Sequence, residues 1–201
     1  MKKISVLDRI LLLITGLLAA YQIVAGIADA GSLAIGAYTV AFGVLLVAGL
    51  LIIILGFEIL DSPLVVIVST IIPLSLSLGL IADHLPAWTM LYAIFTLFGF
   101  ALIVYTRLTQ SGKWAVIPLA IVHGIAGLTI FLLPIIFSFQ GKMPAGFIWV
   151  GIGGALIGVG GLLLAFLKSG KPILSKDIIL TLLPTLLLLM TVTFVIGFAA
   201  V

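Results

Sequence analysis

The sequence predicts an all-α polytopic membrane protein with seven transmembrane helices, and the prediction rests on composition, apolar runs and the placement of charges. Of its 201 residues, 64% are hydrophobic and only 7% are charged. A soluble domain has roughly 25% charged residues and about 45–50% apolar ones. This chain therefore has too few polar groups to cover a surface that faces water, and lipid must surround most of it.

Seven apolar stretches are long enough to cross a bilayer. A hydrocarbon core of about 30 Å requires roughly 20 apolar residues in a helix. The stretches are residues 10–28, 32–57, 63–82, 87–109, 114–139, 145–167 and 178–201. They are continuous rather than alternating, which favours helices over barrel strands. We therefore expect residues 1–201 to form a single transmembrane domain with short loops.

The basic residues predict the orientation of the chain. If the N-terminus is cytoplasmic, Lys142 is the one basic residue that lies outside. The inner side then holds Lys2, Lys3, Arg9, Arg107, Lys113, Lys168, Lys171 and Lys176. Cytoplasmic loops carry an excess of Lys and Arg. We expect a cytoplasmic N-terminus, an external C-terminus and a location in a prokaryotic plasma membrane.

Short motifs recur along the chain and indicate repeated helical hairpins. A Pro-Ala pair begins the segment 86–88 and occurs again at the start of 144–146. A Ser-Gly-Lys motif begins 25 residues after each proline, at 111–113 and at 169–171. The pattern Ile-Ala-Asp, followed by Tyr nine residues after the Asp, also occurs twice, ending at Tyr38 and at Tyr92. Such self-similarity is typical of repeat architectures. Three hairpins that run in the same direction, followed by a seventh helix, would account for the chain.

Glycines concentrate in the sixth predicted span. Without a hydrophobic force between helices in lipid, small residues favour packing because backbones can approach closely. Gly154 and Gly158 form a GxxxG pair, and Gly161 follows on the same helix. The segment Gly36–Gly43 of the second span is a looser version. We expect Gly154, Gly158 and Gly161 to pack against neighbours, and the sixth span to be contacted on more than one face.

His123 is the candidate cofactor ligand. It lies about ten residues into the fifth predicted span and is the one ionisable side chain that deep in the bilayer. A neutral imidazole can ligate haem iron or chlorophyll magnesium, relay a proton, or form a hydrogen bond between helices. The sequence leaves these roles open.

The acidic residues lie at the ends of the predicted spans. Glu58 and Asp61 share a helix face at the inner end of the second span, because their spacing is i, i+3. We expect them to form ion pairs there with a basic residue such as Arg107. Asp83 and His84 mark the outer end of the third span, where we expect a solvated helix terminus. No spacing typical of a metal site is found.

The Gly-punctuated hairpins resemble a known family. The segments 15–18, 25–26 and 42–49 are similar to those of HdeD-type membrane proteins, which are linked to acid resistance. The resemblance covers the first two spans and the fifth and sixth. It implies a small protein of repeated hairpins with no established catalytic site, and the seventh span departs from the six of that family.

Three functions remain open at this point. The first is a non-catalytic structural or accessory subunit that packs against other membrane proteins or against itself. The second is a haem- or chlorophyll-bearing subunit of an electron-transfer or light-harvesting complex that uses His123. The third is a small channel or carrier.

We predict no enzyme activity and no metal site, because the chain lacks cysteine and the common catalytic motifs. The basic residues are too sparse for nucleic acid. Partners are therefore membrane lipids, which we expect to be bound, together with other subunits or copies of this chain.

Overall fold

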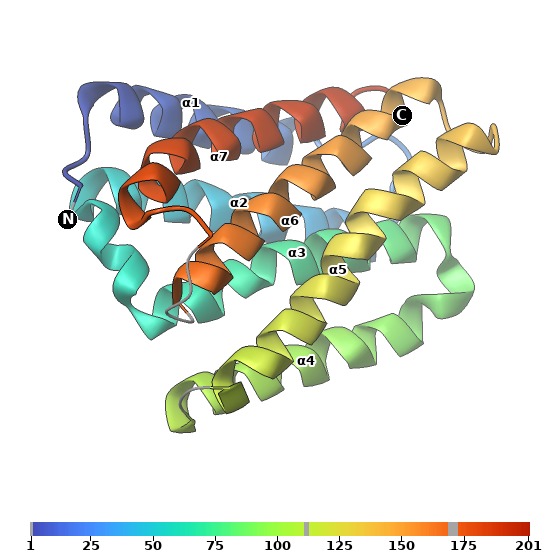
Figure 1. The fold of residues 1–201 in the computed structure, drawn as a ribbon. Helices are drawn as coiled ribbons and strands as arrows, with labels where there is room; N and C mark the ends of the chain where they lie inside the picture. The colour runs from blue at the N-terminus through green and yellow to red at the C-terminus, as the bar shows by residue number, and fades with distance from the viewer. Residues whose placement is uncertain (1, 111–112, 169–172) are drawn as a thin grey trace.

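The fold is a bundle of long helices, as predicted. The computed structural model describes residues 2–110, 113–168 and 173–201. Within these ranges, seven helices are long and apolar enough to cross a membrane. They are α1 (Val6–Ala25), α2 (Ser32–Leu55), α3 (Pro63–His84), α4 (Thr89–Thr109), α5 (Lys113–Phe139), α6 (Ile148–Lys168) and α7 (Lys176–Phe198). The two termini lie at opposite ends of the bundle (Figure 1). An odd number of crossings requires this arrangement.

Local interactions set the ends of the first two helices and shift them from the predicted limits. Ser5 Oγ accepts a hydrogen bond from the Asp8 amide at 3.1 Å, and the Asp8 carboxylate accepts one from the Ser5 amide at 2.9 Å. This capping box starts α1 at Val6, before the predicted residue 10. Gly26 and Gly56 end α1 and α2 with φ angles of 68° and 75°, which side chains with a Cβ rarely adopt. Both helices therefore stop short of their predicted ends at 28 and 57.

The repeated proline motifs fold in the same way. Each forms a short 3-10 turn that leads into a transmembrane helix: η2 (Pro86–Trp88) precedes α4, and η3 (Ala145–Phe147) precedes α6. A third turn, η1 (Phe57–Asp61), connects α2 to α3. The Ser-Gly-Lys half of the motif lies outside the described residues at 169–171 and at 111–112. Its remaining residue, Lys113, is the first residue of α5. The shared turns agree with repeated hairpins that run in one direction.

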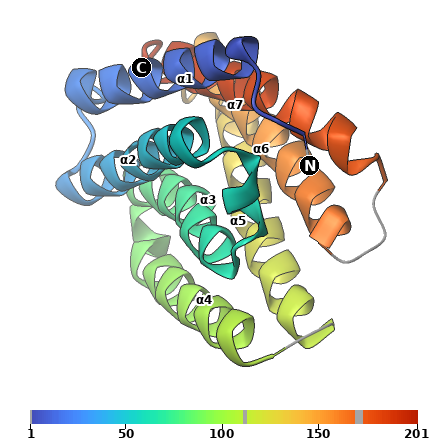
Figure 2. The same cartoon turned by 90° about the vertical axis from the view of Figure 1, so that its left-hand side faces the viewer.

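Six of the helices form a closed ring. The neighbours in this ring are α1 with α2, α2 with α3, α3 with α5, α5 with α6, α6 with α7, and α7 with α1. Figure 2, which views the bundle from the end that holds the N-terminus, shows the ring and shows α4 outside it. Helix α4 packs mainly against α3 and α5, and only 11% of its apolar window is buried. Every other spanning helix is buried to a greater extent.

Aromatic side chains fill the centre of the ring. Phe42 of α2 meets Phe194 of α7 edge to face, with ring centroids 6.3 Å apart. Tyr38 of α2 contacts Phe198 of α7 at 4.9 Å, and Phe147 of η3 lies against Phe198. All six ring helices contribute buried residues to this core, including α1, α3, α5 and α6 through Ala19, Leu76, Leu80, Ile130 and Val150. The core therefore joins helices that are not neighbours in the ring.

Candidate functional site

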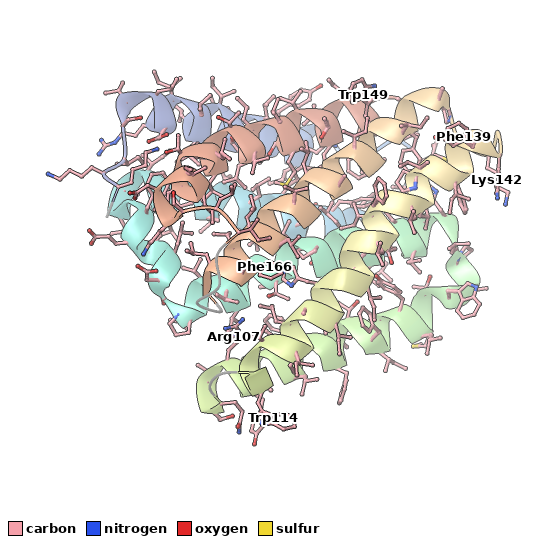
Figure 3. The ribbon with its side chains drawn as sticks, viewed as in Figure 1. Arg107, Trp114, Phe139, Lys142, Trp149 and Phe166 are labelled. Atoms are coloured by element: carbon pink, nitrogen blue, oxygen red, sulfur yellow. The ribbon has the colours of Figure 1, made fainter. Side chains whose placement is uncertain are left out.

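The charged residues divide the bundle into two ends. Arg107 and Trp114 lie toward the end that holds the N-terminus, and Lys142 and Phe139 lie at the other end (Figure 3). We call these the inner and outer ends, because cytoplasmic loops are enriched in Lys and Arg. The Lys142 ammonium lies 5.0 Å from the centroid of the Phe137 ring, which holds this cation at the outer end.

His123 is deep in the bundle, as predicted. It lies about ten residues from the start of α5 at Lys113, which corresponds to about 15 Å at 1.5 Å per residue. Its Nδ1 atom is buried and has no hydrogen-bond partner in the described part of the chain. A nitrogen of this kind is a candidate for contact with a molecule other than the chain itself.

Arg107 lies near His123 and away from the acidic residues expected to pair with it. The Arg107 Nε is buried without a hydrogen-bond partner among the described residues, and its guanidinium is close enough to act electrostatically on His123. None of the ion pairs between described residues includes Arg107. Asp61 instead pairs with Lys176 of α7 at 3.2 Å, and Glu58 is exposed. The expected grouping of Glu58, Asp61 and Arg107 is therefore wrong for Arg107, because α4 lies outside the ring whereas Asp61 reaches toward α7.

The glycines of α6 contact both neighbouring helices at its outer half. A Cβ placed on Gly154 would lie 2.8 Å from the backbone nitrogen of Phe131 in α5. A Cβ on Gly151 would meet the Phe131 carbonyl oxygen at 2.7 Å. On another face, a Cβ on Gly153 would lie 2.6 Å from the Phe194 ring of α7. Helix α6 therefore packs closely on α5 and on α7 through separate glycines.

The inner half of α6 is open on the side of its other glycines. A Cβ placed on Gly158 would meet nothing within 4 Å, so this position does not pack as the GxxxG pattern predicted. Gly161 faces the imidazole, since its Cβ would lie 3.8 Å from His123 Cδ2. Gly158 is exposed at the surface of the bundle, whereas Gly161, further toward the inner end, still faces α5. Figure 3 places Arg107 and Phe166 on this inner side.

A second polar group lies at the outer end of α3. Asp83 accepts a hydrogen bond from the Gly31 amide at 3.3 Å, and its carboxylate lies 4.0 Å from His84 Nε2. The His84 ring packs against Phe147 at 5.1 Å. The Asp83 and His84 side chains are only 17% and 13% exposed, so the expected solvated terminus is instead half-buried. The packing of η3 onto this end explains the difference.

Tyr38 is a residue whose position the sequence analysis did not identify. Its ring lies directly against Gly79 of α3, and its hydroxyl is buried without a partner among the described residues. The related Tyr92 of α4 donates its hydroxyl hydrogen bond to Thr129 of α5 at 3.1 Å. Each tyrosine thus contacts the next helix along the chain, and the Asp-to-Tyr repeat was the signal that could have revealed it.

Most hydroxyl groups in the spans are satisfied by their own helix. Ser77 Oγ donates to the Pro73 carbonyl at 2.7 Å, and Thr191 Oγ1 donates to the Leu187 carbonyl at 2.7 Å. Thr15, Thr70, Thr96, Thr106, Thr129 and Thr181 form the same i to i−4 bond. Within the described ranges, no group of three or more His, Asp or Glu side chains is close enough to hold a metal ion. Arg107 and His123 are therefore the leading candidates for chemistry inside the bilayer.

No family model matches this chain, and comparison with curated proteins and with solved structures yields no match. The resemblance to HdeD-type proteins therefore rests on the hairpin pattern alone. The structure shows an integral membrane protein with a closed helix ring, and its function has to be argued from that geometry.

Proposed function

We propose that this protein is a non-catalytic structural or accessory subunit of a prokaryotic plasma membrane, which packs against other membrane proteins or against a second copy of itself. The observation that carries the proposal is the filled centre of the ring. A core built from all six ring helices leaves the protein's outer surface as the place where it acts.

The same core argues against a channel or carrier. A conducting path needs polar groups or water along the pore. Here Phe42, Phe194 and Phe198 meet across the ring. The nearby hydroxyls of Ser77 and Thr191 are already bonded to carbonyls of their own helices. These contacts favour a rigid packing unit.

We assign the packing surface to α4, because this helix adds nothing to the closure of the ring and exposes most of its surface. Leu97 and Phe98 are 72% and 68% exposed near its middle. In lipid, close van der Waals packing drives helix association. A helix held by only two neighbours offers the widest face for such packing against another protein.

The test uses single-cysteine variants, which are unambiguous because the chain has no native cysteine. Leu97→Cys places a thiol on the outer face of α4, and Leu17→Cys places one on α1, where the side chain is 63% exposed. After oxidation in native membranes, we expect a disulfide-linked dimer, or a discrete adduct after treatment with a bifunctional maleimide, for Leu97→Cys only. Equal reaction of the two variants, or no product from either, would contradict the proposal.

One observation favours a second candidate, the haem- or chlorophyll-bearing subunit. The His123 Nδ1 has no hydrogen-bond partner in the part of the chain that the structure describes, and Gly158 and Gly161 of α6 leave space beside the ring. Against it, the second histidine of the chain, His84, packs between Phe137 and Phe147 at the outer end and cannot complete a bis-histidine site. A Soret or chlorophyll band in the protein purified from its own membrane would favour this candidate over the first.

A further inference from the structure

We propose that Arg107, His123 and the open inner half of α6 form a binding site for one phospholipid of the inner leaflet whose headgroup carries a net negative charge. The inference does not depend on the packing role of α4. It rests on three observations: hydrogen-bonding nitrogens without acceptors, the order of these groups along the membrane normal, and the open space beside Gly158 and Gly161.

The first observation is that two buried side-chain nitrogen atoms have no hydrogen-bond partner among the described residues. Among the described residues, the buried Nε of Arg107 and the buried Nδ1 of His123 both lack a hydrogen-bond partner, and the charge of Arg107 acts on His123. No ion pair within the described ranges supplies a carboxylate to Arg107. Arginine inside a membrane normally pairs with another group. A phosphodiester supplies the matching acceptor oxygens, because guanidinium and phosphate form paired, charge-assisted hydrogen bonds.

The second observation is the order of the groups with depth. Arg107 lies in the last turn of α4, at the inner end, and His123 lies deeper, about 15 Å from the start of α5. Gly161 is level with His123, because its Cβ would lie 3.8 Å from the imidazole, and Gly158 is one turn further toward the membrane centre. A phospholipid of the inner leaflet presents its groups in the same order. Its phosphate faces Arg107, an ester carbonyl accepts a hydrogen bond from His123, and its acyl chain passes Gly158.

The third observation is that the described chain leaves the surface beside Gly158 uncovered, where an acyl chain can lie. Helices α5 and α6 are tightly packed at Gly154, whereas Gly158, one turn further inward, is exposed. Gly158 has no atom of the described chain within 4 Å of an added Cβ. Phe166, also on α6, is 39% exposed at the inner side. The space is therefore bordered by apolar groups and can be entered from the surrounding lipid.

The experiment measures lipid binding to the delipidated full-length protein in detergent micelles by native mass spectrometry. Phosphatidylglycerol, which is anionic, and phosphatidylcholine, which is zwitterionic, serve as probes. We expect one phosphatidylglycerol to bind more tightly than phosphatidylcholine. Arg107→Gln should weaken phosphatidylglycerol binding by roughly tenfold, the scale of losing one charge-assisted pair. The matched control Arg9→Gln, an exposed arginine at the inner end of α1, should retain the affinity.

A second pair of variants keeps the test valid if Arg107→Gln fails to fold. Gly158→Leu fills the open space without meeting existing atoms and should abolish the preferred binding. Gly36→Leu, at an equally open position on α2, should leave it unchanged. The proposal is overturned if both glycine variants behave alike or if the two lipids bind equally. It is also overturned if inorganic phosphate displaces the lipid, which would indicate a free-anion site, or if the purified protein carries a porphyrin band.

Discussion

Single glycines of α6 differ because each faces a different neighbour. In lipid, contact between helices depends on how closely their backbones approach. Gly154 lies against the backbone of α5, whereas Gly158, one turn away, faces open space. The GxxxG spacing places both residues on one side of the helix but does not reveal that only Gly154 meets the backbone of α5. Identical residues in one motif therefore have opposite tolerance to substitution.

We predict that Gly154→Ala destabilises the protein and that Gly158→Ala does not. The added methyl group at 154 would lie 2.8 Å from a backbone nitrogen of α5, so the helices must separate. Overpacking of this kind costs about 1–3 kcal/mol. At 158 the methyl group meets nothing, and replacing a mid-helix glycine gains about 0.5–1 kcal/mol. The readout is the thermal unfolding midpoint in detergent micelles. Equal midpoints for the two variants would show that Gly154 does not pack against the backbone of α5.

Helix boundaries depend on caps, and the caps differ in strength from one helix to the next. Helix α1 has a complete capping box, and Lys2 adds an ion pair to Asp8 at 3.0 Å. Helix α2 starts after Gly31, which has no side chain to cap it. A hydropathy window that begins at the first long apolar run cannot register these contacts, so the predicted start of α1 was too late.

Ser5→Ala should fray the first turn of α1. Loss of an N-cap hydroxyl typically costs about 0.5–2 kcal/mol. Amide hydrogen exchange of residues 6–9 should accelerate, because Asp8 loses the acceptor for its backbone hydrogen. Ser32→Ala serves as the control, since the side chain at the first residue of α2 caps nothing there. Unchanged exchange in Ser5→Ala would mean that Lys2 and the lipid interface hold α1 in place without the box.

For the molecule as a whole, the sequence was sufficient for the number of spans but not for their arrangement. Apolar length identifies a span, and the basic residues orient it. Neither property reports how a helix is rotated about its axis. Helix α2 is apolar on every side, so no periodic pattern indicates the face that carries Tyr38 and Phe42. The closure of the ring by α1 and α7, and the exclusion of α4, arise from contacts between distant segments.

The candidate site shows the same limit. The depth of His123 follows from counting residues, and the structure agrees with it. The direction of the Arg107 side chain cannot be predicted by counting residues, because an arginine in the last turn of a helix can extend toward water or back into the protein. The pairing of Asp61 with Lys176 of α7 is likewise a contact between distant segments that the sequence does not report.

The orientation of the whole bundle can be tested with two thiols. Lys142→Cys lies at the outer end, and Lys3→Cys lies at the inner end beside the N-terminus. Seven crossings with a cytoplasmic N-terminus predict that a membrane-impermeant maleimide labels Lys142→Cys in intact cells. Lys3→Cys should react only after permeabilisation, and the lack of native cysteine removes background labelling. The reverse pattern would mean that the basic end faces outward, against the charge rule. Labelling of both positions from one side would require an even number of crossings between them, which is incompatible with the five spanning helices, α1 to α5, that lie between Lys3 and Lys142.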